Sequence, residues 1–185
     1  MPAPTKRLFL ALTPPEPVRA EVAALASPLD GARWTRRAQL HITLRFLGSV
    51  AEDTIEAMSR RLAAIRVEPF ILPVEGVGSF PPDAPPRVIW AGIGRGHPRL
   101  YQLRQKLDDT LIAGGVQLDV RTFHPHLTVA RCVGTTLADV KRWLRARADF
   151  AAAPFRVDAF DLYASEPTPE GSAYMLLRRF PLTGV

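Results

Sequence analysis

Two copies of one four-residue pattern constrain this chain more than any other feature of its sequence. The first copy is HITL at residues 41–44, and the second, 85 residues later, is HLTV at residues 126–129. Both lie in runs of β-branched and large apolar residues, which predict β-strands. Because side chains alternate between the two faces of a strand, the histidine and the threonine of each copy share a face, about 6.6 Å apart along the strand. If the two strands are neighbours, two imidazoles and two hydroxyls line one site.

The regions around the two motifs repeat as well. Phe70 and Phe155 each follow the motif histidine by 29 residues and begin an apolar run. Between the motif and this run, apolar residues recur at helical spacing in both halves. The sequence of each half therefore predicts a strand, a helix, the motif strand, a helix and a strand. In the first half we expect the first strand at 7–12 and the first helix at 15–27, and in the second half their counterparts at 87–93 and 98–113. The last two strands of the chain are expected at 155–163 and 173–180. The simple alternation of strands and helices in many folds is the alternative explanation.

A duplicated lobe is the fold that explains this repeat best. We expect an α+β fold of two duplicated lobes, each an antiparallel sheet with helices packed outside, related by a pseudo-two-fold axis with a central cleft between them. Residues 1–185 form a single domain in this interpretation, and the repeat spans roughly residues 1–80 and 87–180. Four prolines among residues 81–87 mark the junction between the lobes.

Composition places few limits beyond a globular fold. With 185 residues, 47% of them hydrophobic, the chain has the composition of an ordinary soluble protein that can form one good core. It contains no run of 18 apolar residues, so no membrane span is expected, and its apolar stretch LFLAL is too short for a secretory signal. A single cysteine, Cys132, suits a reducing cytoplasm. We expect a cytoplasmic protein and, because one chain can build the whole cleft, a monomer.

Positive charge comes almost entirely from arginine. Of 24 basic residues 21 are arginine, and the formal net charge is +6. Arginine forms bidentate contacts with phosphate and stacks on bases. Arg33, Arg36 and Arg37 surround Trp34 just before the first motif, a combination typical of contacts with single-stranded nucleic acid. A solvated surface or a bias of genome composition is the other explanation of the arginine content.

Three kinds of chemistry are compatible with the paired motifs. His124 and His126, with His41 as a third imidazole, could hold a catalytic zinc ion, but neither motif strand contains a carboxylate and the repeated threonine is left unexplained. Thr43 or Thr128 could act as a nucleophile activated by histidine, but no third group that would orient the imidazole is apparent. We therefore expect neither a metal ion nor another cofactor.

Acid–base catalysis by His41 and His126 accounts for the whole pattern. Imidazole titrates near neutrality, so one ring can be neutral while the other is protonated. Such a pair suits in-line cleavage of a phosphodiester, in which one imidazole activates water and the other protonates the leaving oxygen. Thr43 and Thr128 would donate hydrogen bonds to the phosphoryl oxygens. A lone histidine on a strand is more often structural, but two in matched contexts favour catalysis.

These residues resemble the 2H phosphoesterases, which are named for their two His-x-Thr-x motifs. Within that superfamily the chain is similar to the RNA 2′,3′-cyclic phosphodiesterases, also called 2′-5′ RNA ligases, in the segments RLFLAL, RWTRRAQLHITLRFLG, PPRVIWAGI and FHPHLTVAR. The similarity covers nearly the whole chain. It implies a bilobal α+β fold and metal-independent hydrolysis of an RNA terminal 2′,3′-cyclic phosphate to a 2′-phosphate, with reversible 2′-5′ joining of RNA ends as a side activity.

Carried over residue by residue, the resemblance assigns roles to the residues of both motifs. It implies that His41 protonates the 3′ oxygen and that His126 activates water, although the two halves are alike enough for these roles to be exchanged. It also implies that Thr43, Thr128 and Arg131 hold the phosphate.

Two arginines compete for the phosphate. Strict alternation from His126 puts Arg131 on the opposite face of its strand, so a bulge or the end of the strand must turn it inward. Arg45 shares parity with His41 and Thr43 and is therefore the rival phosphate ligand.

Two other functions fit the same residues. The arginine content fits an RNA-binding module that keeps the cleft without turnover, and its salt-sensitive binding would survive loss of both histidines. A 2H enzyme that acts on small cyclic nucleotides fits the motifs equally well. Turnover of a mononucleotide compared with that of an oligonucleotide would separate this second function from the leading one.

Overall fold

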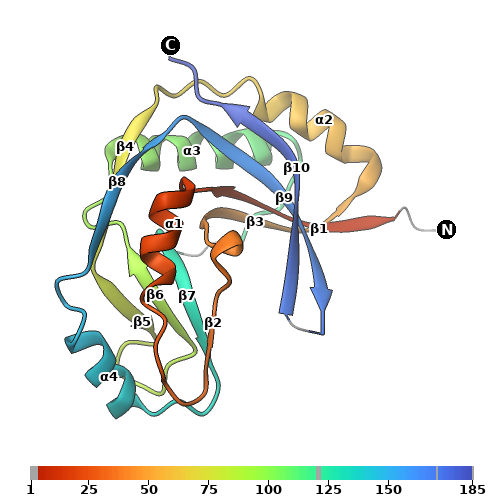
Figure 1. Ribbon diagram of the computed structural model, residues 1–185. Coiled ribbons are helices and arrows are strands. Elements are labelled where there is room, and N and C mark those ends of the chain that lie inside the picture. The colour runs from red at the N-terminus through yellow and green to blue at the C-terminus, as the bar shows by residue number, and fades with distance from the viewer. Residues whose placement is uncertain (1–3, 120–121, 170, 185) are drawn as a thin grey trace.

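The computed structural model describes residues 4–119, 122–169 and 171–184 (Figure 1). Within these residues the chain alternates between strands and helices. In chain order the elements are β1 (Thr5–Leu12), α1 (Glu16–Ala23), β2 (Ala32–Trp34), the 3₁₀ helix η1 (Arg37–Gln39), β3 (Ile42–Ala51), α2 (Glu52–Leu62), β4 (Phe70–Glu75), β5 (Val77–Phe80), β6 (Val88–Gly92), α3 (Pro98–Ala113), β7 (His126–Cys132), α4 (Leu137–Arg145), β8 (Ala151–Val157), β9 (Ala159–Thr168) and β10 (Gly171–Pro181).

Local sequence sets the bounds of the first helix of each half. Helix α3 begins and ends where the sequence predicts, because Pro98 suits a first helical turn and His97 accepts a hydrogen bond from the Arg99 N–H as the N-cap. Its buried residues recur every three or four positions and are Leu100, Leu103, Leu107 and Leu111. Helix α1 is shorter than predicted and ends at Ala23. Pro28 disfavours a helical residue before it, which explains why the chain has left the helix by then.

Two apolar runs that the sequence presents as continuous are each divided into two strands. Gly76, with a φ of 76°, separates β4 from β5, and Asp158 separates β8 from β9. Glycine adopts this left-handed backbone readily because it has no Cβ atom. The predicted single strand at 155–163 is therefore wrong. Each break sends the two parts of the run to different neighbours, since β4 pairs with β8, whereas β5 pairs with β6 and β9 with β1.

The large sheet is antiparallel, with the strand order β10-β9-β1-β3-β7-β6-β5 and β2 paired to β7. Its two parts join at β3 and β7 through one residue pair, Ile42 with Leu127. We call β1, β3, β9 and β10 the His41 wing, and β2, β5, β6 and β7 the His126 wing. The predicted α+β class and antiparallel sheet are confirmed. Each wing takes strands from both halves of the sequence, because β9 and β10 join β1 while β5 joins β6.

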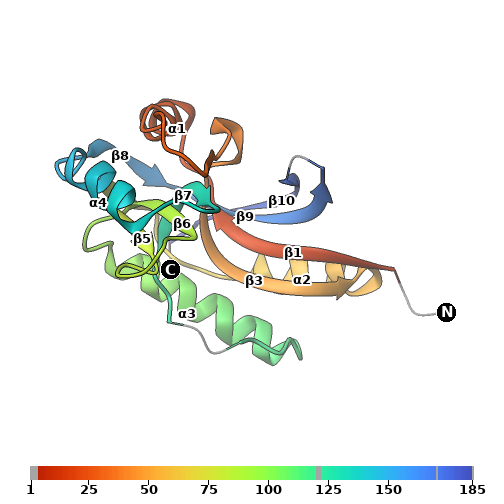
Figure 2. The ribbon, with the colours of Figure 1, turned by 90° about the horizontal axis from the view of Figure 1, so that it is seen from below.

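Helices lie on both sides of the large sheet. Figure 2 shows α3 and α1 on opposite sides of β3. Helix α2 contacts β3 and α3, whereas α1 contacts β8 and α4 contacts β5. The apolar side chains between these layers form one continuous core, in which Leu10, Ile42 and Leu127 are fully buried. Among the described residues, the helices are too short or too polar to cross a lipid bilayer.

Candidate active site

The two motifs meet where the wings join. His41 immediately precedes β3, and His126 is the first residue of β7. The antiparallel residue pair that joins the wings puts His41 level with Thr128. By the same register, Thr43 is level with His126. All four side chains are half-buried, so the structure brings the two imidazoles and the two hydroxyls to one place, as the repeat predicts.

A backbone carbonyl fixes the tautomer of each imidazole. Nδ1 of His41 lies 2.7 Å from the carbonyl oxygen of Gln39, and Nδ1 of His126 lies 2.6 Å from that of His124. Because a carbonyl oxygen only accepts, each Nδ1 carries a proton, and each Nε2 is left to exchange protons with a ligand. Nε2 of His41 lies 3.1 Å from the Thr43 hydroxyl. Each carbonyl comes two residues before its histidine, so this arrangement is itself part of the repeat.

Both imidazoles favour the neutral form in the free protein. Desolvation by burial is the largest cause that lowers the pKa of His41 below 6.5, and the charges of His126 and Arg131 lower it further. Desolvation by burial is also the largest cause of the lowered pKa of His126, followed by the charges of His124 and Arg131. A negative charge beside an imidazole favours its protonated form. An anionic ligand would therefore promote protonation of the ring it approaches.

A β-bulge in β7 changes which residues face the site. The register of β7 with β6 shifts between Thr128 and Ala130, which leaves Val129 unpaired. The extra residue reverses the alternation of side chains, so Arg131 returns to the face that carries Thr128. The Val129 carbonyl accepts a hydrogen bond of 2.9 Å from the Thr35 N–H instead of a ladder bond. The bulge that the predicted role of Arg131 requires is thus present.

Two arginines lie opposite each other beside the histidines. Arg33 of β2 is the cross-strand partner of Arg131 on β7, and both are exposed. Side chains directly opposite each other share a face of the sheet, and like charges in that position repel. Neither guanidinium forms an ion pair within the part of the chain that the structure describes. A phosphate between the two would replace this repulsion with charge-assisted hydrogen bonds.

Arg45, the rival phosphate ligand, lies on the other face of β3. The register of β3 with β1 shifts between Thr43 and Arg45, so Leu44 is bulged and the parity of Arg45 is reversed. Nε and Nη2 of Arg45 lie 2.8 and 2.6 Å from the carboxylate oxygens of Asp108 on α3. Arg104, also on α3, binds Asp108 and donates to the carbonyl of the bulged Leu44. The structure therefore does not bring Arg45 together with the histidines, because strict alternation fails at the bulge.

The arginine-rich segment before the first motif is dispersed in the fold. Trp34 is half-buried against Trp143 of α4, with 5.6 Å between ring centroids, so part of its ring surface is covered by the protein itself. Nε of Arg37 lies 3.0 Å from the carboxylate of Glu16. Arg33, opposite Arg131, is a residue of the predicted cluster that lies beside the site.

Aromatic side chains that the sequence analysis did not single out surround both imidazoles. The ring centroids of Phe9 and Tyr174 lie 5.0 and 5.2 Å from that of His41. Around His126 the nearest such rings are those of Phe80 and Trp90, at 5.2 and 6.3 Å. Their apolar surfaces exclude water from the imidazoles, which explains why desolvation lowers both pKa values. Their types suit strands, but the sequence does not indicate which of them meet across the sheet.

The residues near the motifs do not form an evident metal centre. Among the described residues, no group of three or more histidines, cysteines, aspartates and glutamates is arranged to hold a metal ion. The ring centroids of His124 and His126 are 5.9 Å apart. Nδ1 of His126 is occupied by a carbonyl, so this ring has Nε2 alone for a ligand.

Similarity to known proteins points to one family. The family model described as LigT like phosphoesterase matches the chain twice, at residues 12–90 and 94–174, and each match contains one motif. A relative from Aeropyrum pernix, described as an RNA 2′,3′-cyclic phosphodiesterase, is 36% identical over 138 residues, which cover 74% of this chain and 78% of the relative. A relative from Archaeoglobus fulgidus with the same description is 33% identical over 177 residues, which cover 94% of this chain and 99% of the relative.

The fold of this chain is also similar to that of solved structures. The crystal structure of Escherichia coli LigT complexed with 3′-AMP superposes with a TM-score of 0.79 at 28% sequence identity. The similarity covers 97% of this chain and 99% of that one. The agreement therefore extends over both wings and includes the junction at which the motifs meet.

Proposed function

The chain belongs to the LigT like phosphoesterase family, and on that premise we propose that it hydrolyses the terminal 2′,3′-cyclic phosphate of RNA to a 2′-phosphomonoester without a metal ion or cofactor. The relatives from A. pernix and A. fulgidus, described as RNA 2′,3′-cyclic phosphodiesterases, support the choice of substrate. The observation that carries the proposal is the pair of imidazoles on neighbouring strands, each with its Nδ1 proton held by a backbone carbonyl.

The reaction needs a base and an acid on opposite sides of the phosphorus atom. Nε2 of His126 accepts a proton from a water molecule, whose oxygen forms a new bond to phosphorus. The bond between phosphorus and the 3′ oxygen breaks, and Nε2 of His41 gives its proton to that oxygen. The product carries a 2′-phosphate and a free 3′-hydroxyl. Exchange with solvent then returns a proton to His41 and removes one from His126.

Hydroxyls and guanidinium groups stabilise the phosphoryl oxygens in this scheme. Thr43 and Thr128 lie level with the opposing histidines and donate neutral hydrogen bonds. Arg131 adds a charge-assisted bond that strengthens as negative charge develops on the phosphoryl oxygens. Its cross-strand partner Arg33 raises the positive potential of the same place.

Two related activities follow from the same step. If the 5′-hydroxyl of a second RNA attacks in place of water, the product is a 2′-5′ phosphodiester, and we regard this joining as a side activity. Hydrolysis of a small cyclic nucleotide is the second candidate function. The crystal structure of E. coli LigT complexed with 3′-AMP, a mononucleotide, supports this second candidate.

We further propose that the protein acts as a monomer in the cytoplasm. All the residues invoked in the reaction come from one chain, so the site needs no contribution from a second copy. Cys132, the single cysteine, is a buried free thiol, which suits a reducing compartment.

An RNA oligonucleotide with a 2′,3′-cyclic phosphate end tests this function. We expect turnover in excess EDTA, with a 2′-phosphomonoester identified by phosphorus NMR, and no turnover by a His41→Ala/His126→Ala double variant. Loss of activity on chelation would favour a metal centre, and a 3′-phosphate product would contradict the proposed bond cleavage. Salt-sensitive RNA binding with no product from the wild-type protein would favour an RNA-binding module.

A further inference from the structure

The two motif histidines lie on different wings, and within the described residues the sheet joins these wings through one residue pair, Ile42 with Leu127. Elsewhere in the sheet, β1 pairs with β3 and β6 pairs with β7 along several residues. The spacing between His41 and His126 must nevertheless be well defined, because a misplacement of about 1 Å can lower the rate of an enzyme about 10²-fold. One residue pair constrains that spacing weakly, so other contacts must fix it.

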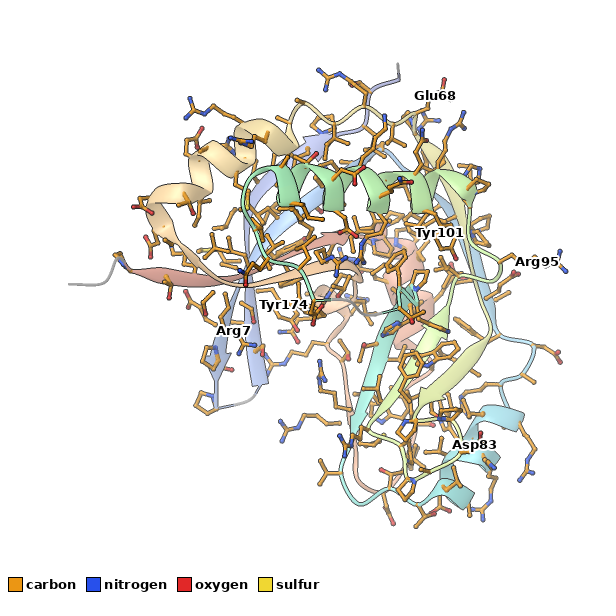
Figure 3. The ribbon with its side chains drawn as sticks, turned by 180° about the vertical axis from the view of Figure 1, so that it is seen from behind. Arg7, Glu68, Asp83, Arg95, Tyr101 and Tyr174 are labelled. Atoms are coloured by element: carbon orange, nitrogen blue, oxygen red, sulfur yellow. The ribbon has the colours of Figure 1, made fainter. Side chains whose placement is uncertain are left out.

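Arg104 of α3 contacts the chain on both sides of this junction. Its guanidinium donates to the carbonyl of Leu44, the bulged residue of the first motif. Its guanidinium carbon lies 4.8 Å from the ring centroid of Phe123. Phe123 directly precedes His124, whose carbonyl holds Nδ1 of His126. Figure 3 views the molecule from the side of α3, the face of the sheet opposite the histidines, so this arginine supports both motifs from behind.

A largely buried network of charges fixes the guanidinium of Arg104. Its Nε lies 3.0 and 2.9 Å from the two carboxylate oxygens of Asp108, which also binds Arg45 of β3. Nη1 of Arg45 donates at 2.9 Å to the carbonyl of Asp119, in the segment that leads to β7. The side chains of Arg104 and Arg45 are 11% and 10% exposed. Burial acts to raise the pKa of Asp108, but hydrogen bonds from Arg45 and Arg104 lower it below 3.8, so the carboxylate stays charged. Guanidinium donors point in fixed directions, so the network sets position as well as charge.

The two bulges are each bound by the segment that precedes the other motif strand. Arg104 belongs to α3, which precedes β7 in the chain, yet it binds the bulge of β3. Thr35 precedes β3, yet its N–H donates at 2.9 Å to the carbonyl of Val129, the bulge of β7. Each motif strand is therefore connected to the segment that leads into the other one. Two such crossed contacts oppose movement of one wing relative to the other.

We propose that Arg104 is a positioning residue that holds the two half-sites at a fixed separation without touching the substrate. The inference rests on the proposed function, because that reaction needs the Nε2 atoms of His41 and His126 on opposite sides of one phosphorus atom. Arg104 acts on His41 through the bulge of β3. It acts on His126 through Phe123 and the carbonyl that orients the imidazole. Asp108 keeps the guanidinium in the direction that both contacts require.

Apolar packing of α3 is the other feature that could hold the wings together. Leu100, Leu103 and Leu107 of this helix are fully buried in the common core. The hydrophobic effect is not directional, so these side chains attach the helix to the sheet without setting the path of the bulged backbone. A hydrogen bond to the Leu44 carbonyl has a preferred direction and sets that path. Loss of the guanidinium, with the leucines intact, separates the two explanations.

Removal of the guanidinium tests the positioning role. Arg104→Met keeps an unbranched side chain but donates no hydrogen bond, and we expect kcat on the 2′,3′-cyclic-phosphate oligonucleotide to fall about 10- to 100-fold. The KM should change much less, because Arg104 does not contact the substrate. Arg99→Met is the matched control, since Arg99 lies on the same helix and pairs with Glu68, which Figure 3 shows at the periphery of the molecule. An equal kcat in the two variants would overturn the role of Arg104.

Double variants separate positioning from a general loss of folded protein. If Arg104 sets the separation of the two imidazoles, Arg104→Met should lower kcat much less in a His41→Ala or a His126→Ala protein than in the wild-type protein, because one of the groups to be positioned is absent. A general loss of folded protein would lower kcat by the same factor in all three backgrounds. Equal factors would therefore contradict positioning.

Hydrogen exchange examines the junction without a substrate. In Arg104→Met the backbone amides of residues 41–44 and 126–129 should exchange about 10-fold faster, as expected for the loss of one hydrogen bond from a charged group. The amides of β9, which belongs to the His41 wing but does not pair with β3 or β7, should change little. Uniform acceleration along the chain would show that Arg104 supports global stability and would overturn the inference.

The outcomes also separate this inference from the proposed function. If the wild-type protein hydrolyses the cyclic phosphate and Arg104→Met keeps its full kcat, the positioning role is wrong and the function stands. If the wild-type protein has no turnover but Arg104→Met exposes the junction amides alone, the function is wrong and Arg104 still holds the two half-sites together.

Discussion

The strands β3 and β7 carry the same motif and the same bulge, directly after the motif threonine. In β7 the bulge turns Arg131 toward the histidine face. In β3 it turns Phe46 toward that face and sends Arg45 to α3, where Asp108 binds it. An identical backbone feature therefore presents a cation in one wing and an aromatic ring in the other. The two half-sites have kept their geometry while the chemistry beside their histidines has diverged.

The two bulges also differ in what stabilises them. The bulged carbonyl of Leu44 accepts from the guanidinium of Arg104, a side chain of α3, whereas that of Val129 accepts from the backbone N–H of Thr35. A buried carbonyl without a partner costs about as much free energy as a lost hydrogen bond, so each donor stabilises its bulge. Different hydrogen-bond donors thus stabilise the same bulge in β3 and in β7. The bulge, rather than its donor, is the feature that the two wings share.

The largest expected effect concerns the element that the wings share. His41→Ala and His126→Ala should each lower kcat by about 10²–10⁴, the usual contribution of general acid–base catalysis, measured on a 2′,3′-cyclic-phosphate oligonucleotide. His97→Asn is the matched control, because this histidine caps α3 outside the site and asparagine is a good N-cap. Near wild-type rates in both alanine variants would contradict the mechanism.

The next effect separates the two arginines that follow the motifs. Arg131→Ala should lower kcat by about 10²–10³, the usual loss on removing one donor to the developing charge, with little change in the free energy of unfolding. Arg45→Ala should instead lower the free energy of unfolding by about 1–3 kcal/mol, because it removes charged hydrogen bonds in a largely buried position while Arg104 still neutralises Asp108. Single-turnover kinetics measure the loss of rate, and urea unfolding measures the loss of stability. A large loss of rate in Arg45→Ala with little loss in Arg131→Ala would place the phosphate on Arg45.

A smaller effect concerns the pH dependence that the two wings share. Burial first, and then Arg131 among the nearby charges, lower the pKa of both histidines below 6.5, so the maximum of kcat/KM should lie on the acid side of pH 6.5. The two limbs report apparent values of the coupled pair. Arg131→Gln removes one charge and should move the maximum to higher pH. A maximum above pH 7 in the wild-type protein, or no movement in this variant, would refute the electrostatic account.

The smallest expected effect is on stability. Between the lowered folded-state pKa of His41 and its unfolded value near 6.5, the unfolded chain binds more protons than the folded one. The free energy of unfolding therefore falls as the pH drops through 6.5 and levels off below the folded-state pKa. His41→Asn abolishes this proton uptake, so denaturant unfolding at pH 7.5 and 5.5 should show a smaller fall than in the wild-type protein. An equal fall in both proteins would mean that His41 is not desolvated.

Several elements of the fold can be predicted from short stretches of the sequence. The bounds of α3 follow from the spacing of its leucines and from the proline in its first turn, and both features act within a few residues. The strand breaks at Gly76 and Asp158 are harder to predict, because an apolar run continues across each of them. Each run is divided because its two parts pair with different strands. The mixing of the two halves within each wing is for the same reason a property of the assembled sheet.

The sequence by itself determined that two strands each carry a histidine and a threonine on one face, because residue type and strand alternation are local properties. Only the tertiary structure decided which residues accompany those histidines. The bulges at Leu44 and Val129 depend on hydrogen-bond donors from other parts of the chain, and each unpaired residue reverses the alternation of the side chains that directly follow it. That reversal puts Arg131 and Phe46 on the histidine face and directs Arg45 to the opposite one.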